Sequence, residues 1–308
     1  MTSGTIAIMG AGSVGCAYGA DLALGGEAVT LIGRPAFAEA VAARGLIFEK
    51  GGRRETLFPT NGASASPSLT ASASPEALRD AGIVLFTVKS GDTEEAGRAI
   101  APHLAPDATV FSLQNGIGNA ERLAAVLGRP VIPVVVYIAA QTLAPGHIRH
   151  NGRGELVFPP GPASEAAAQR LAAAGVRTEI SPDVETTMWV KFVVNCCVNA
   201  FSALTQQTYG RIVAEPGAER VLRDVMEECV AVATASGIAL PADLWTTVRG
   251  VCDGMAAQLS STAQDLCRGH RTEIDYLNGE IVRRAAALGL SVPVNNALWV
   301  LVKLAEGR

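Results

Sequence analysis

Residues 5–15 read T-I-A-I-M-G-A-G-S-V-G, a short apolar run that passes directly into a glycine-rich loop. We expect a buried strand over Thr5–Met9, a helix over Val14–Leu24 and a second strand over Ala28–Ile32. A G-x-G-x-x-G sequence alone is often only a turn. Between a strand and a helix it is typical of a loop that holds a dinucleotide, because the helix N-terminus offers free N–H groups to the pyrophosphate. This stretch therefore predicts a Rossmann-type parallel sheet.

Each glycine of this loop has its own expected task. Gly10 permits the tight turn, Gly12 lets the backbone approach a pyrophosphate, and Gly15 lets the helix pack close to the sheet. The candidate cofactor-binding residues of the loop are Gly10, Ala11, Gly12, Ser13, Val14 and Gly15.

The residues after the second strand set the cofactor preference. An NAD site places Asp or Glu there, bonded to the ribose 2′-hydroxyl, whereas this chain has Gly33-Arg34-Pro35. Arg34 could form charge-assisted hydrogen bonds to a 2′-phosphate. The alternative is an exposed arginine that serves solubility. The missing acid favours NADP(H).

The rest of the first half continues to alternate strand and helix patterns, which favours a parallel sheet covered on both faces. Further strands are expected over Ile83–Val88, Thr109–Leu113 and Val131–Ile138. The Ala-, Ser- and Pro-rich segment Thr60–Pro75 is expected to be an exposed connection, although strand residues could lie within it. Alternating residues and glycines over Gly146–Pro160 suggest antiparallel edge strands.

Two polar positions follow strands of this sheet. Asn115 belongs to Q-N-G-I-G-N after Thr109–Leu113, and Lys89 ends I-V-L-F-T-V-K. Ligands of parallel sheets bind at the carboxyl ends of the strands, so both side chains are candidates for cofactor contact. The alternatives are an Asn-Gly turn and a solvated strand end.

Strand patterns end near Pro182, and helical patterns dominate afterwards. We therefore expect two domains, residues 1–182 and 183–308, the second all-α. Its first helix is apolar nearly all round, yet Lys191, Asn195 and Asn199 recur every four residues and fall on one stripe with Ser202. Such a stripe either faces a pocket for a polar ligand, or consists of a snorkelling lysine and two amides bonded to nearby backbone.

Composition excludes several classes of protein. The 308 residues carry a net charge of −4 and no Lys/Arg cluster, which argues against nucleic-acid binding. Six cysteines without a C-x-x-C pair favour buried hydrophobes over a metal site or disulfides, and fit a reducing cytoplasm. The N-terminus lacks the features of a signal peptide, and no window approaches ~20 uninterrupted apolar residues, so we expect no membrane span.

Taken in order, these motifs resemble the ketopantoate reductase family (2-dehydropantoate 2-reductases). The resemblance covers nearly the whole chain and rests on G-A-G-S-V-G, T-V-K, L-Q-N-G-I-G, Y-I-A-A, P-G-H-I-R-H-N-G-R-G, W-V-K-F-V-V-N-C-C-V-N, S-S-T-A-Q-D and T-E-I-D-Y-L-N-G. The Lys/Asn helix and T-E-I-D-Y-L-N-G are the most specific of these.

The resemblance implies the NADPH-dependent reduction of 2-dehydropantoate to (R)-pantoate, a step toward pantothenate and coenzyme A. It implies that Lys191 is the catalytic lysine and general acid, and that homodimers form through the helical domain. The residues implied to bind substrate are Asn115, Asn195, Asn199, Ser260 and Ser261. Those implied to contact the cofactor, besides the glycine loop, are Arg34, Lys89, Asn115, Ala140 and Glu273.

Hydride addition to a ketone builds negative charge on oxygen, so an ammonium beside that oxygen suits the same chemistry. Glu273 could equally be a first-turn helix acid, and Ser260-Ser261 a helix-end turn. Thr262 stands where the family commonly has methionine, and Tyr209 falls near where some members place a further substrate amide. Two other functions therefore stay open: reduction of another branched 2-oxo acid, and non-catalytic NADPH sensing.

Overall fold

The computed structural model describes residues 4–60 and 68–307. The chain forms two compact units, of which unit 1 is Met1–Val184 and unit 2 is Glu185–Arg308. The sequence pattern places this boundary at 182/183.

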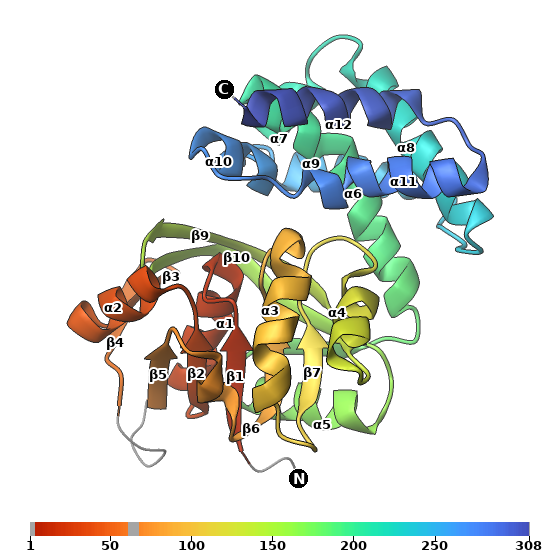
Figure 1. Cartoon of the computed structure of the whole chain (residues 1–308). Coiled ribbons are helices and arrows are strands. Elements are labelled where there is room, and N and C mark those ends of the chain that lie inside the picture. Colours follow the sequence, from red (N-terminus) through yellow and green to blue (C-terminus); the bar gives the residue numbers. More distant parts are fainter. Residues whose placement is uncertain (1–3, 61–67, 308) are drawn as a thin grey trace. The chain divides into compact units, whose positions relative to one another are not determined.

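Unit 1 is built on a parallel six-stranded sheet with strand order β5-β2-β1-β6-β7-β8 (Figure 1). The strands are β1 (Thr5–Met9), β2 (Ala28–Ile32), β5 (Ser68–Ser72), β6 (Ala81–Phe86), β7 (Thr109–Ser112) and β8 (Ile132–Pro133). Successive strand residues point to opposite faces, so Ile6 and Ile8 enter one core and Ala7 enters another. The sheet is therefore buried on both faces, as predicted.

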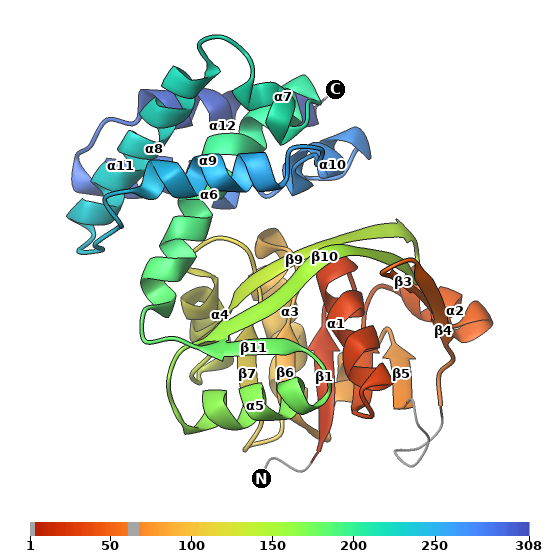
Figure 2. The same ribbon diagram turned by 180° about the vertical axis from the view of Figure 1, so that it is seen from behind.

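Helices and a second sheet provide the two covers. Helix α1 (Ser13–Leu24) lies on one face, and α3 (Thr93–Ile100) and α4 (Asn119–Leu127) lie on the other. The second sheet packs against α1 (Figure 2). It contains β3 (Leu46–Lys50), β4 (Arg53–Leu57), β9 (Val135–Ala144), β10 (His147–Phe158) and β11 (Arg177–Ile180), while α2 (Pro35–Arg44) and α5 (Pro162–Ala173) complete the unit.

One expectation about unit 1 holds in part, and one needs correction. Strand residues do lie within Thr60–Pro75, because Ser68–Ser72 forms β5 and pairs with β2 while Leu69 is buried; residues 61–67 lie outside the described residues. An edge strand of small residues carries little periodic signal. Gly146–Pro160 is antiparallel to a neighbour as predicted, but it is not at an edge, because β10 pairs with β9 on one side and with β3 and β11 on the other.

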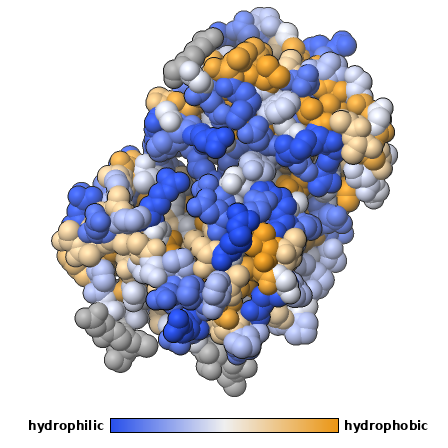
Figure 3. All heavy atoms as spheres, viewed as in Figure 1, coloured by the Kyte–Doolittle hydropathy of each residue, from blue (hydrophilic) through white to orange (hydrophobic). Residues whose placement is uncertain are grey.

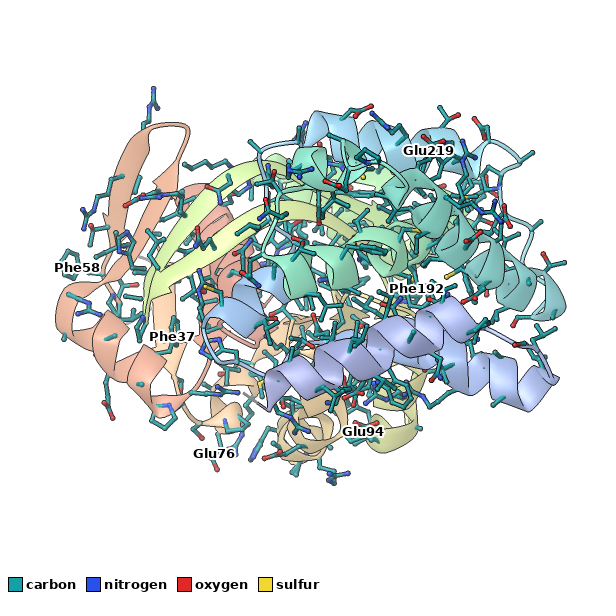
Figure 4. All side chains as sticks on the ribbon, turned by 90° about the horizontal axis from the view of Figure 1, so that it is seen from above. Phe37, Phe58, Glu76, Glu94, Phe192 and Glu219 are labelled. Carbon is teal, nitrogen blue, oxygen red and sulfur yellow. The ribbon has the colours of Figure 1, made fainter. Side chains whose placement is uncertain are left out.

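Unit 2 is helical, as predicted. It contains α6 (Val184–Thr205), α7 (Tyr209–Val213), α8 (Ala218–Ala235), α9 (Leu244–Gly254), α10 (Ser261–Cys267), α11 (Asn278–Leu288) and α12 (Pro293–Glu306). Phe192 of α6, labelled in Figure 4, is 1% exposed. Its ring packs edge-on against that of Trp189, with the ring centroids 5.5 Å apart. Among the described residues, α6 is the one helix long and apolar enough to cross a bilayer. Since 61% of that apolar window is buried, it resembles the core helix of a globular unit.

One helix of unit 2 begins later than the sequence indicates. The residue pattern over Thr272–Leu288 is helical throughout, but residues 272–277 form a loop with the short turn η4 (Ile274–Tyr276), and α11 starts at Asn278. The loop keeps this shape because side chains of α12 bind Thr272 and Asp275. Glu273 is therefore not a first-turn helix acid.

Candidate functional site

The glycine loop has the form that an anion site requires. Gly10 and Ala11 donate backbone hydrogen bonds of 2.9 Å to Ile32 O, which ties the loop to β2. A Cβ on Gly15 would lie 2.3 Å from Gly10 O, so only glycine lets α1 start this close to the loop. The first turn of α1, all of it described, contains no acidic residue and has no side-chain cap. Its N–H groups and positive dipole end therefore face whatever binds there.

Three neighbouring loops at the carboxyl ends of β1, β6 and β7 are fastened to one another. Thr87 Oγ1 donates to Gly10 O at 2.7 Å, and Ser90 Oγ donates to Asn115 O at 3.2 Å. Asn119, 3% exposed, donates through Nδ2 to Asn115 O at 2.7 Å. The backbone of Asn115 is thus fixed from two sides, and the loop that carries it is held against the loop after Lys89.

Several supporting residues of this edge were not identified from the sequence. Gln114 is 7% exposed and donates to Val88 O and to Thr93 Oγ1. Arg122 donates to Ser90 O at 3.0 Å and also to the carboxylate of Glu94. The hydrogen bond from Arg122 is the main cause of the lowered pKa of Glu94. The signal in the sequence is a glutamine directly after the apolar run Thr109–Leu113, because an amide at the end of a buried strand needs hydrogen-bond partners.

The other predicted cofactor residues of unit 1 lie at two places. The side chain of Arg34 is 88% exposed at the end of β2 and lies 3.7 Å from the carboxylate of Asp92. Lys89 is exposed after β6. Ala140 lies on β9, in the second sheet, and packs against the same core as Ala11 and Val14. Arg34, Lys89, Asn115 and the glycine loop therefore share the carboxyl edge of the first sheet, whereas Ala140 belongs to the second sheet.

In unit 2, the predicted stripe on α6 runs from half-buried to buried. Lys191 and Asn195 are half-buried, Asn199 is 3% exposed and Ser202 is fully buried. Tyr209, 6% exposed, donates its hydroxyl hydrogen to Asn199 Oδ1 at 3.2 Å. Burial raises the pKa of Tyr209, so the phenol stays protonated and acts as the donor. The Asn199 amide is thereby oriented, with its oxygen toward Tyr209.

The two serines after α9 have different surroundings. Ser260 is 1% exposed; its hydroxyl donates to Asn199 O at 3.2 Å and accepts from Ala263 N at 3.0 Å as the N-cap of α10. Its N–H donates to Ser202 Oγ at 3.1 Å. Ser261 is exposed. The hydrogen bonds of Ser260 therefore join α10 to α6, a supporting task that the sequence pattern did not reveal.

Glu273 is half-buried in the loop between α10 and α11. Within the described residues, no cluster of three or more His, Cys, Asp or Glu side chains could hold a metal ion. The described cysteines are free thiols, and five of the six are buried. Burial raises the pKa of Cys252 to about 11, which keeps this thiol protonated and poorly nucleophilic.

Comparison with known proteins covers both units. The family model described as ketopantoate reductase PanE/ApbA matches residues 6–163, and the model of the ketopantoate reductase PanE/ApbA C terminal matches residues 183–306. A 2-dehydropantoate 2-reductase of Pyrococcus horikoshii is 32% identical over 306 residues, which is 98% of this chain and 97% of that protein.

Solved structures agree with this match. A PanE/ApbA family ketopantoate reductase from Ralstonia eutropha has a TM-score of 0.92 and 48% identity, with 98% of each chain covered. D-mandelate dehydrogenase, solved with NADH and anilino(oxo)acetate, has a TM-score of 0.87 at 22% identity, with 98% of each chain covered. A dimeric ketopantoate reductase from Staphylococcus aureus has a TM-score of 0.83 at 19% identity, with coverage of 98% and 99%. At the last two identities, the likeness shows the fold alone.

Proposed function

Because this chain belongs to the ketopantoate reductase family, we propose that it reduces 2-dehydropantoate to (R)-pantoate with NADPH. The observation that carries the proposal is the joint presence of a dinucleotide loop in unit 1 and a half-buried Lys191 on a polar stripe in unit 2. The product would feed pantothenate and coenzyme A synthesis.

The residues of unit 1 fit a nicotinamide dinucleotide. A Cβ built on Gly12 would meet no atom within 4 Å, so the backbone there has open space in front of it that a pyrophosphate can fill. The residues of unit 1 that would hold the cofactor are those of the glycine loop, Lys89, Asn115 and Ala140, with Arg34 at the 2′-phosphate. The family resemblance adds Glu273 of unit 2, at the junction of cofactor and substrate. When bound, the cofactor supplies a hydride to the carbonyl carbon of the substrate.

Lys191 has the chemistry that the substrate oxygen needs. As hydride reaches the carbonyl carbon, the C=O π electrons move onto oxygen, and an ammonium beside it stabilises that charge. Nζ then gives the oxygen a proton, and the neutral amine regains one from solvent. Lys191 is therefore the proposed general acid. Its half-buried position strengthens this electrostatic effect relative to a fully exposed lysine, because partial burial reduces the screening by water.

The amides of the stripe are the proposed substrate ligands. Because Oδ1 of Asn199 accepts from Tyr209, the amide offers a ligand its N–H donors, which suit a carboxylate or hydroxyl oxygen. Asn195 lies one turn from both Lys191 and Asn199 on α6. Ser261 and Asn115 are further proposed substrate-binding residues. Ser260 already uses its hydroxyl as donor and acceptor, so its contribution to substrate binding would be through Asn199.

A second candidate function is the reduction of another branched 2-oxo acid, because Thr262 stands where the family commonly has methionine. Reduction of another branched 2-oxo acid would use the same Lys191 chemistry and differ only in the residues that shape the pocket. Non-catalytic NADPH sensing is the alternative of a different class, and the polar stripe on α6 argues against it.

The test is NADPH oxidation by the purified protein, followed by absorbance, with 2-dehydropantoate and a panel of other 2-oxo acids. The proposal expects the highest kcat/KM with 2-dehydropantoate. Turnover only with a different 2-oxo acid would change the assigned substrate and leave the proposed role of Lys191 unchanged. NADPH binding without turnover of any acid would favour the sensor.

We further propose a homodimer in the cytoplasm. Val300, Leu301 and Leu304 of α12 are 43%, 49% and 62% exposed, and Figure 3 shows apolar atoms gathered over this part of unit 2. An exposed apolar stripe of this kind commonly marks a protein interface. Six free thiols suit a reducing compartment. No nucleic-acid or membrane partner is indicated, and the expected partner is a small 2-oxo acid.

A further inference from the structure

The loop that carries Glu273 is fastened to α12 on both sides of this residue. On the N-terminal side, Glu306 Oε1 accepts hydrogen bonds from Thr272 N at 2.8 Å and from Thr272 Oγ1 at 2.6 Å. On the C-terminal side, Asp275 Oδ1 accepts from Trp299 Nε1 at 2.7 Å. Glu273 therefore sits between two anchored neighbours, and its backbone has little freedom to shift.

One ammonium joins the two anchors. Lys303 Nζ donates to Asp275 Oδ2 at 2.9 Å and to Glu306 Oε2 at 2.7 Å. Each carboxylate thus uses one oxygen to hold the loop and gives the other to Lys303. Without that cation, two carboxylates would face each other at the end of α12. Their mutual repulsion would pull on Thr272 and Asp275, the two residues that flank Glu273.

The sequence of α12 suits this arrangement. Trp299, Lys303 and Glu306 are spaced four and three residues apart, so they lie on one face of the helix. Gly279 makes room for the indole, because a Cβ there would lie 3.0 Å from Trp299 Nε1. Arg283 supports the same loop by donating to Asp275 O at 2.7 Å.

We propose that Lys303 is a positioning residue for Glu273, holding the Thr272–Asp275 loop in place through Asp275 and Glu306. This inference rests on the proposed function, in which Glu273 lies at the junction of cofactor and substrate. Lys303 itself touches neither. It acts by keeping the Glu273 carboxylate in the geometry that the reaction needs, where a displacement of about 1 Å can cost roughly 100-fold in rate.

The experiment compares Lys303→Met, which keeps the length of the side chain but removes its charge, with Lys303→Arg. We expect Lys303→Met to lower kcat for 2-dehydropantoate by roughly 10- to 100-fold, and Lys303→Arg to recover most of that loss. Arg249→Met is the matched control, because Arg249 forms an exposed ion pair with Asp253 on α9. If Lys303→Met does not fold, Trp299→Phe serves instead, because it removes the anchor hydrogen bond to Asp275 together with part of the indole ring.

A double variant separates positioning from general stability. In a Glu273→Ala background, Lys303→Met should still lower the melting temperature. It should cause no further loss of kcat/KM, because the side chain that Lys303 positions is gone. Losses of kcat/KM that multiply would overturn the inference. So would a Lys303→Met protein with wild-type kcat and KM.

Amide hydrogen exchange gives a readout that does not depend on turnover. Exchange of the 272–276 amides should speed up in Lys303→Met and stay unchanged in Arg249→Met. Unchanged exchange in both variants would sink the positioning inference, whatever the activity. Faster exchange in Lys303→Met, together with no turnover by the wild type, would sink the proposed function and leave the anchoring of the loop standing.

Discussion

At the scale of single residues, the hydrogen bond between Tyr209 and Asn199 shows how the chain orients a side chain that is predicted to bind substrate. Tyr209 opens α7, ten residues after Asn199, and both are buried. The every-fourth-residue spacing on α6 was enough to predict the stripe. It could not show which atom of the Asn199 amide faces inward, because that depends on a partner beyond the end of the helix.

Tyr209→Phe tests this orientation. Removing one buried hydrogen bond costs about 1 kcal/mol, and the freed amide can turn, so we expect KM for 2-dehydropantoate to rise roughly 5- to 10-fold. We expect kcat to stay within about threefold, because the bond supports binding rather than the chemical step. Steady-state kinetics measure both. A fall in kcat at constant KM would assign Tyr209 to the chemistry instead.

Tyr18→Phe tests the opposite situation, a buried tyrosine hydroxyl that makes no hydrogen bond to the described residues. Tyr18 is 1% exposed, and its hydroxyl has no hydrogen-bond partner among the described residues. Deleting a buried, unpaired hydroxyl should be neutral or stabilising by up to about 1 kcal/mol, and should leave activity unchanged. Thermal unfolding checks this. A clear drop in melting temperature would mean that the hydroxyl makes a hydrogen bond in solution.

Arg34 is the residue at which cofactor choice can be tested. Arg34→Asp should weaken NADPH binding by roughly 10- to 100-fold and NADH binding far less, because only NADPH carries the 2′-phosphate. Fluorescence titration with both cofactors measures the two constants. Equal losses of affinity for both cofactors would show that Arg34 does not bind the 2′-phosphate.

At the scale of elements, the end of α12 couples stability to pH. Burial alone would raise the pKa of Asp275, but hydrogen bonds from Trp299 and Lys303 lower it overall, and Glu306 behaves likewise with Lys303 and Thr272. For Lys303, burial would lower the pKa, yet its hydrogen bonds to Glu306 and Asp275 raise it. The two carboxylates therefore add stability above their unfolded pKa values, and this stability is lost as pH falls through the lowered folded values.

Lys303→Met should consequently destabilise the protein at neutral pH. The difference from the wild type should shrink as pH falls below about 4, where the carboxylates become protonated and no longer need the cation. Unfolding curves at several pH values measure this difference. A difference that stays constant down to acid pH would mean that lost packing of the lysine stem, rather than charge, causes the destabilisation.

Some helices and strands could be predicted from the local sequence, and others could not. Strands such as β1 and β6 were predictable because they are continuous apolar runs, and α6 because of its composition. Strand β5 is made of S-L-T-A-S and gains its place from pairing with β2, which the local sequence does not encode. The late start of α11 depends on hydrogen bonds from α12, roughly thirty residues away.

At the scale of the whole molecule, the order of motifs predicted a Rossmann-type unit followed by a helical one, and both folds are confirmed. The supporting residues were harder to predict, because Gln114, Asn119 and Ser260 act through contacts between distant segments. The roles of Lys191, Asn195 and Glu273 stay predictions that only variants can test.

Assembly is testable at the same scale. If α12 forms the dimer interface, Leu304→Glu should convert a dimer to a monomer in light scattering after gel filtration, because a charge would enter an apolar contact. Phe58→Glu is the control, since Phe58 is 59% exposed after β4 in unit 1 (Figure 4). A wild-type monomer, or a dimer that Leu304→Glu leaves intact, would contradict this interface.

The most direct test of the central claim compares wild type and Lys191→Met for NADPH oxidation with 2-dehydropantoate and for NADPH binding. If Lys191 is the general acid, the variant loses roughly 100- to 10,000-fold in kcat and binds NADPH as the wild type does. A Lys191→Met protein that reduces 2-dehydropantoate at the wild-type rate would contradict the account.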